Sequence, residues 1–217
     1  MEISEQVSMA KMTDKCVLCR RAGEKLFLKG DRCASPKCAI VRRPYAPGMH
    51  GQKGSRNQSE YARQLAMKQR IKRIYGVLER QFRHHYQEAT EEKGIAGDLL
   101  LARLERRLDN VIYRLGFASS RMQARQLVGH KWFTVNGRRM NISSMGVKVG
   151  DVITLKASKK EKTYLKTQSE LLKNKTDVPA WLSIDTDKME AKVVALPSRS
   201  DVGNNVDAQL VVEYYSK

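Results

Sequence analysis

The sequence predicts an α+β fold in three parts: an N-terminal segment with four cysteines, a mostly helical lobe, and a unit of two helices with a small antiparallel sheet. Three observations support this fold class. The chain's four cysteines all lie between Cys16 and Cys38. Apolar residues recur at helical spacing over 101–115. An Asn-Gly pair at 136–137 stands between two apolar runs, the strongest short signal for a β-hairpin.

The cysteines form two close pairs, spaced C-x2-C and C-x4-C, and are Cys16, Cys19, Cys33 and Cys38. Two such pairs separated by a loop are typical of a tetrahedral metal site with four thiolate ligands. The segment has few apolar residues, whereas a structural zinc ion supplies about 10 to 16 kcal/mol of apparent binding energy. Zinc is therefore the favoured cofactor, in a closed site that organises structure and does not catalyse. A [4Fe-4S] cluster on the same cysteines stays open, as do a disulfide, a redox pair and free thiols.

Residues 42–58 combine prolines, glycines and basic side chains without any periodicity. This composition predicts an extended basic loop, although a flexible linker has a similar composition. Gly48, Gly51 and Gly54 have no Cβ atom, so the loop backbone could approach other backbone closely at these positions.

Beyond the loop, apolar spacing and capping residues predict the elements of the two remaining parts. Helices are expected from Ser59 to about Leu78, over 79–93, from Asp98 to Leu115, and from Ser119 or Ser120 to about Val128. Strands are expected over 132–135, just after Arg139 and over 149–155. After a solvated connector, 158–162, we expect a helix over 164–173, strand-like segments at 181–185 and 192–196, and an apolar end at 210–215.

These elements group into three expected domains. Residues 1–43 are the N-terminal extension and the four-cysteine segment, 44–96 are the helical lobe, and 97–163 are the unit of two helices and a sheet. The tail, 164–217, is expected to return to the helical lobe and to supply core rather than charge.

Positive charge is concentrated in the first three quarters of the chain. The whole chain has 41 Lys and Arg against 23 Asp and Glu, a net charge of +18, but residues 164–217 hold only 7 against 8. This balance, with 6% aromatic residues, indicates a surface for a polyanion rather than a small-molecule enzyme. No apolar run approaches the roughly 18 residues of a membrane span, and the first residues fit neither a signal nor a transit peptide. We therefore expect a cytoplasmic protein.

The segment RLERRLDNVIYRLGFASSRMQARQLVGHKWFTVNGRRMN, residues 103–141, resembles an S4-type RNA-binding domain. The segments RRPYAPGMHGQKG, KQRIKRIYGVLERQF and VEYYSK extend the likeness to the S4 family of bacterial small-subunit ribosomal proteins. The cysteine spacing is similar to that of the metal-binding members of this family. The likeness covers Cys16 to Lys217, whereas the residues before Met12 have no recognised counterpart.

This resemblance implies a structural, non-enzymatic constituent of the small ribosomal subunit. It implies early binding to a multi-helix junction in the 5′ domain of 16S rRNA, which nucleates subunit assembly. It also implies a place near the site where mRNA enters, where the protein contributes to translational accuracy. The implied partners are 16S rRNA, neighbouring small-subunit proteins, mRNA and, in some members, the message of their own operon. No homo-oligomer is required.

Positive charge and the resemblance together select the expected RNA-binding residues. RNA helices present phosphates and 2′-hydroxyls more readily than base edges, so a junction binder should spread many cations over two lobes. Lys68 with Lys72, and Arg121 with Arg125, repel each other unless a phosphate lies between them. The expected contacts are Arg20, Arg21, Arg42, Arg43, His50, Lys53, Lys68, Arg70, Lys72, Arg73, Arg80, Arg83, Arg107, Arg114, Arg121, Gln123, Arg125, His130, Lys131 and Arg138.

Two other functions fit the sequence less well. The tripeptide Arg107-Leu108-Asp109 resembles one that holds the catalytic aspartate of some pseudouridine synthases. Here it lies inside a helical stripe, and the chain shows neither a separate catalytic domain nor a nucleophile–base pair. A zinc-containing DNA-binding protein would place a recognition helix beside the metal, whereas a Pro/Gly loop follows these cysteines.

Overall fold

A computed structural model describes residues 14–53, 58–160, 164, 172, 178–186, 188–203 and 206–216, with backbone only at 157 and 160. The chain divides into two compact units between Asn57 and Gln58. The expected N-terminal extension and most of the expected helix over 164–173 lie outside the described residues. Among the described helices, none combines the length and apolar character that crossing a membrane requires.

The first unit consists of short helices around the cysteines. They are α1 (Lys15–Ala22), α2 (Asp31–Ala34), α3 (Ala39–Arg42) and the 3-10 helix η1 (Gly51–Lys53). Its buried apolar side chains include Leu26 and Leu28, together with Cys19, Cys33 and Cys38. Because the thiols make up so much of this small core, hydrophobic burial alone stabilises the unit weakly.

The basic loop that follows the cysteines is fastened to α1. Arg20 donates from Nε to the Tyr45 carbonyl at 3.0 Å, and its guanidinium lies 5.0 Å from the centre of the Tyr45 ring. A Cβ atom at Gly51 would lie 1.8 Å from the Ala46 carbonyl oxygen. The expected close backbone approach is therefore confirmed at Gly51 but not at Gly48, where a Cβ atom would meet nothing within 4 Å. Gly54 lies outside the described residues.

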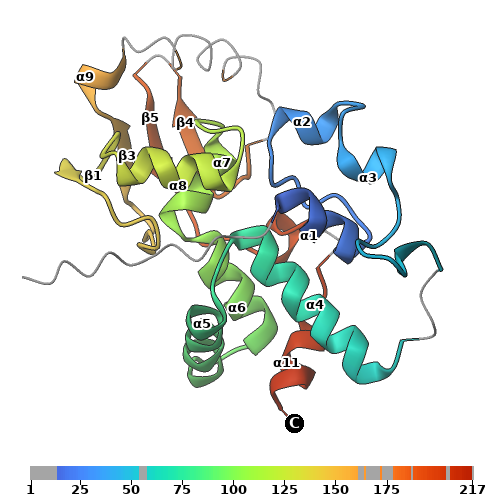
Figure 1. The fold of residues 1–217 in the computed structure, drawn as a ribbon. Coiled ribbons are helices and arrows are strands. Elements are labelled where there is room, and N and C mark those ends of the chain that lie inside the picture. Colours follow the sequence, from blue (N-terminus) through green and yellow to red (C-terminus); the bar gives the residue numbers. More distant parts are fainter. Residues whose placement is uncertain are drawn as a thin grey trace, which may run out of the picture. The chain divides into compact units, whose positions relative to one another are not determined.

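The helical lobe is built from α4 (Glu60–Tyr75), α5 (Glu79–Glu91), α6 (Ala96–Glu105) and α11 (Gln209–Tyr215) (Figure 1). Ser59 caps α4 as expected, because its Oγ accepts a hydrogen bond from the Ala62 amide. The helix ends at Gly76, whose φ of 63° is left-handed, and not at Leu78. The core of this lobe is formed by Ile71, Tyr75, Val77, Phe82, Ala89, Leu100, Leu101, Leu104, Val202, Val206, Ala208 and Val211.

The last helix, α11, returns to the helical lobe through its aromatic residues. The Tyr215 ring stacks on Tyr86 with 4.5 Å between the ring centres, and its hydroxyl donates to the Glu79 carboxylate at 2.9 Å. The Lys68 ammonium lies 4.3 Å from the centre of the Tyr214 ring. The final residues of the chain therefore help complete the helical lobe.

The apolar stripe over 98–115 is divided between two helices, α6 and α7 (Leu108–Leu115), so the single helix expected from Asp98 is wrong. Arg107 between them has an extended ψ of 135°. The backbone here bonds to a distant segment instead of continuing the helix. The Leu108 amide donates to the Met145 carbonyl at 2.8 Å, and the Arg106 carbonyl accepts from the Val147 amide at 2.9 Å.

The second part of this unit packs α7 and α8 (Arg121–Gly129) against one antiparallel sheet. Its strand order is β2 (Arg138–Arg139), β1 (Phe133–Val135), β3 (Val152–Leu155), β5 (Glu190–Val193) and β4 (Leu182–Asp185). The expected hairpin is confirmed, with Asn136 and Gly137 at positive φ values of 49° and 77°. Its return strand is Arg138–Arg139 itself, however, and does not begin after Arg139 as expected. Ser120 caps α8 through a hydrogen bond from the Gln123 amide. A short helix, α9 (Ala157–Lys160), overlaps the start of the expected connector.

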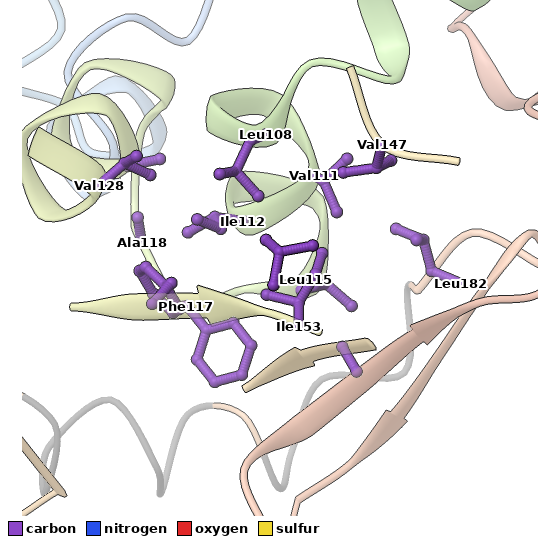
Figure 2. Close-up of a cluster of buried hydrophobic side chains, with 14 of the residues drawn as sticks. Leu108, Val111, Ile112, Leu115, Phe117, Ala118, Val128, Val147, Ile153 and Leu182 are labelled. Atoms are coloured by element: carbon purple, nitrogen blue, oxygen red, sulfur yellow. The ribbon is translucent and has the colours of Figure 1, made fainter. Parts of the chain in front are cut away.

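Figure 2 shows the core of this two-layer part. Leu115 of α7 lies beside Ile153 of β3, and the same cluster includes Leu108 of α7 and Leu182 of β4. The tail therefore divides between the two lobes: β4 and β5 extend the sheet, whereas α11 packs in the helical lobe. The expectation that the whole tail joins the helical lobe applies to α11 and not to the two strands.

Substitution of Glu79 should change the pH dependence of stability. Partial burial raises the pKa of Glu79, but hydrogen bonds from Lys68, Lys72 and Tyr215 outweigh it and lower this pKa from 4.5 to about 2. Because the folded-state pKa is depressed, the stabilisation is present above pH 4.5 and is lost as the pH falls toward 2. Urea unfolding at pH 7 and pH 3 should show a smaller loss of unfolding free energy for Glu79→Gln than for wild type. Equal losses would contradict this assignment.

Candidate nucleic-acid interface and four-cysteine pocket

All four cysteines line one pocket in the first unit, together with Leu28 and Ile40. The Lys29 amide donates to Cys33 Sγ at 3.3 Å, which is a favourable contact for a thiolate. Burial raises the pKa of Cys19, and the nearby thiols Cys33, Cys16 and Cys38 raise it further, against a backbone hydrogen bond from Leu26 that lowers it. The four sulfurs are thus close enough to interact, and a cation among them would favour their ionised form.

The structure does not itself show a metal site at these cysteines. The described cysteines are free thiols. Among the described residues, no group of three or more His, Cys, Asp or Glu side chains has an arrangement that could hold a metal ion. The four thiols line one pocket without being drawn together in such an arrangement, so zinc remains a prediction.

Most of the expected RNA-binding residues fall into two groups, and the first group is exposed. In the first unit it comprises Arg21, Arg42, Arg43, His50 and Lys53; in the second it comprises Arg80, Arg83, His130, Lys131 and Arg138. Arg70 and Arg73 on α4 are partly buried. Arg80 and Arg83 lie on α5 beside a hollowed surface that His84 and Gln87 also line. Arg139, which the sequence list lacks, is exposed next to Arg138 on edge strand β2, and the adjacent basic pair was the available signal.

The second group binds partners within the protein, and the clearest case is Lys68 with Lys72. The Glu79 carboxylate lies between the two ammonium groups, 2.7 Å from Lys68 Nζ and 2.9 Å from Lys72 Nζ. The Glu79 carboxylate therefore offsets the repulsion between the two lysines, whereas the sequence suggested that a phosphate would do so. Lys68 is also buried, with 5% of its surface exposed.

Asp109 holds two of the expected RNA-binding arginines in the same way. Its carboxylate accepts from Arg107 Nη2 at 2.9 Å and from Arg125 Nη2 at 2.8 Å. Arg107 is 2% exposed. Asp109 lies on a helix, as expected, but in the first turn of α7 and not inside a continuous helical stripe. Both of its carboxylate oxygens already accept hydrogen bonds from arginines. This arrangement agrees with the rejection of a synthase-like active site.

Glu105 is the third carboxylate of this kind and is fully buried. It accepts from the Tyr75 hydroxyl at 2.6 Å, from Asn110 Nδ2 at 2.6 Å and from Arg114 Nη2 at 2.8 Å. Burial raises the pKa of Glu105, but hydrogen bonds and charge from Arg114 outweigh it and lower the pKa. Glu105 is therefore a buried anion that these partners stabilise.

Three more predicted contacts have internal roles. Arg121 donates to Asn110 Oδ1 at 2.7 Å and lies over the Tyr75 and Tyr113 rings. Gln123 accepts from Ser119 across the start of α8. Arg20 fastens the basic loop, as described above. Their expected RNA contacts stay predictions, but each side chain would have to bind RNA in addition to these partners or in exchange for them.

Removing one arginine from Asp109 should destabilise the fold. Arg125→Ala leaves the buried carboxylate with Arg107 as its remaining guanidinium partner and removes the hydrogen bond to the Gly76 carbonyl. We expect a loss of about 2 kcal/mol in unfolding free energy, measured by urea denaturation. Arg80→Ala, an exposed control on α5, should change it by less than about 0.5 kcal/mol. Equal stability of the two variants would show that Arg125 is not structural.

Comparison with known proteins agrees with this architecture. The sequence matches the family described as "Ribosomal protein S4/S9 N-terminal domain" over residues 11–105 and the family described as "S4 domain" over residues 106–153. The second match covers α7, α8, the hairpin and the first half of β3. Together the two matches span well over half of the chain.

Three relatives that match over nearly their full length share one name. "Small ribosomal subunit protein uS4" of Solidesulfovibrio magneticus is 52% identical over 210 residues, covering 96% of this chain and all of that protein. The protein of that name from Pelotomaculum thermopropionicum is 54% identical over the same coverage. The one from Thermus thermophilus is 51% identical over 202 residues, covering 93% of this chain and 96% of the relative. These are names of a ribosomal protein and not of an enzyme, so the expectation of a non-enzymatic protein is confirmed. The chain belongs to the uS4 family of small ribosomal subunit proteins.

Proposed function

We propose that this protein is a structural constituent of the small ribosomal subunit and binds 16S rRNA through the exposed cations of its helical lobe and its S4 domain. The exposed basic residues on α5 and on the β1–β2 hairpin are the observation that carries this proposal. They stand on elements fixed by two hydrophobic cores, so the cations are held in place before RNA binds. A preorganised array of this kind suits structured RNA, which presents phosphates at fixed positions.

The family supports a more specific role for the protein. It would bind a multi-helix junction of the 5′ domain early, nucleate assembly of the subunit in the cytoplasm, and contact neighbouring ribosomal proteins. It would also lie where mRNA enters and contribute to translational accuracy there. Binding to the message of its own operon is a further role found in some members. The net charge of +18 supports the polyanionic partners common to these roles.

We also propose that Cys16, Cys19, Cys33 and Cys38 bind one zinc ion. The shared pocket, the buried thiols and the Lys29 amide on Cys33 support this proposal. Four protein ligands leave no open coordination position, so the ion would stabilise the first unit and hold Arg21 and Arg42 near one another in the fold. A [4Fe-4S] cluster on the same thiolates is the alternative.

The hairpin cations provide a direct test of RNA binding. Arg138→Ala with Arg139→Ala removes two exposed charges from β2. If both arginines contact phosphates, affinity for a 16S rRNA 5′-domain transcript should fall, and the slope of log affinity against log salt should decrease by about one to two. Filter binding across a salt titration measures both quantities.

The matched control removes the same charge elsewhere. Lys188→Ala with Lys192→Ala changes two exposed lysines at the β4–β5 hairpin, outside the expected contacts. This control should lower affinity less than the β2 variant. Equal losses would mean that net charge alone drives binding. Equal affinity of the wild-type protein for an unrelated structured RNA would contradict site-specific rRNA binding.

Metal content tests the second proposal. The purified protein should contain about one zinc per chain by elemental analysis, and Cys33→Ser should lose it and destabilise the first unit. Ser35→Ala is the control and should keep the metal. Ser35 lies two residues from Cys33, and its hydroxyl makes an exposed hydrogen bond to the Arg32 carbonyl. Iron with sulfide in place of zinc would identify the cluster instead, and wild-type protein without metal would reject both.

A further inference from the structure

The two lobes of the second unit have separate hydrophobic cores that meet at a polar junction. One core contains α4, α5, α6 and α11 side chains, and the other contains α7, α8 and sheet side chains. Between them Glu105, Arg107, Asp109 and Asn110 are buried, each with 2% or less of its surface exposed. Burying four polar side chains so close together destabilises the fold unless their polar atoms are paired.

The pairs at this junction connect one lobe to the other. Glu105, at the end of α6, accepts from Arg114 and Asn110 of α7. Arg125 of α8 donates from Nη1 to the carbonyl of Gly76, which ends α4, at 3.1 Å. Arg121 of α8 lies over the ring of Tyr75, 5.0 Å from its centre. Three contacts of different chemistry therefore fix the C-terminal ends of α4 and α6 to the S4 domain.

The Asp109 carboxylate sets the position of Arg125 for this connection. It accepts from Arg125 Nε at 3.2 Å and Nη2 at 2.8 Å, which leaves Nη1 directed to the Gly76 carbonyl. Arg114 likewise uses both Nε and Nη2 on Glu105, and Nη2 also reaches the Asp201 carbonyl at 3.1 Å. A two-pronged guanidinium–carboxylate contact restrains angle as well as distance.

We propose that Glu105 is a positioning residue: through Arg114 and Asn110 it fixes the orientation of the S4 domain relative to the helical lobe, and this orientation sets affinity for one RNA that contacts both lobes. The RNA part of this inference rests on the proposed function. A buried ion pair often adds little stability compared with apolar residues of the same shape, whereas its directional bonds specify one geometry. An apolar junction would instead permit sliding between the two lobes.

The direction of the change in RNA affinity distinguishes a positioning role of Glu105 from a purely electrostatic effect. Glu105→Gln removes a negative charge from a protein that binds a polyanion, so a purely electrostatic effect would strengthen RNA binding. If Glu105 positions the lobes, the same substitution should weaken binding to a two-lobe RNA by at least about tenfold, although the net charge rises. The two explanations therefore predict opposite changes.

The experiment measures the inter-lobe distance and RNA affinity in the full chain. Orthogonal dyes are placed on noncanonical residues at Gln87 on α5 and Lys148 before β3, both exposed. Single-molecule energy transfer without RNA should give one narrow distance population for wild type and a broader or shifted one for Glu105→Gln. Affinity is measured for the 16S rRNA 5′-domain transcript. Glu88→Gln, which removes an acid that pairs with Arg103 inside the helical lobe, is the matched control and should leave the distance unchanged.

A second variant keeps the inference testable if Glu105→Gln does not fold. Arg114→Lys keeps the positive charge but loses the two-pronged contact with Glu105. It should broaden the distance distribution and weaken cognate RNA binding. A contact between this side chain and a phosphate that depends on charge alone would survive the substitution. An unchanged distance distribution in both folded variants would overturn the positioning role. Failure of wild type to prefer the cognate transcript would reject the proposed RNA function and leave the distance result standing.

Discussion

Three carboxylates bind five of the cations that the sequence assigned to RNA contact. Glu79 binds Lys68 and Lys72, Asp109 binds Arg107 and Arg125, and Glu105 binds Arg114. In a chain with a net charge of +18, these side chains would otherwise repel one another inside the second unit. The acids convert that repulsion into charge-assisted hydrogen bonds between helices. The remaining exposed cations can then form a surface for RNA.

The same carboxylates connect elements that are distant in sequence. Glu79 also accepts from the Tyr215 hydroxyl, so the final helix, the start of α5 and the middle of α4 meet at one side chain. Glu105 joins α6 to α7 at the point where the apolar stripe is interrupted. Two separate cores are thereby held by polar contacts of defined direction. Such a frame suits a protein whose proposed partner is a folded RNA with phosphates at fixed positions.

Local signals predicted much of this fold. Ser59 and Ser120 cap their helices, and Asn136-Gly137 forms the hairpin turn, because capping and turn geometry depend on a few adjacent residues. The break before Leu108 was not predicted, because the backbone there pairs with residues near Met145, far along the chain. For the same reason the sequence could not separate the exposed cations from those bound to acids, because that division depends on long-range contacts.

The division between exposed and acid-bound cations is tested most directly by an experimental structure of the protein bound to a 16S rRNA 5′-domain transcript. Hydrogen-bond distances from each arginine to the nearest phosphate and carboxylate oxygens are the quantities to measure. The account predicts phosphates at Arg80, Arg83 and Arg138, with Arg107 still on Asp109 and Arg114 still on Glu105. Phosphates on Arg107 and Arg114, with their carboxylates displaced, would contradict it.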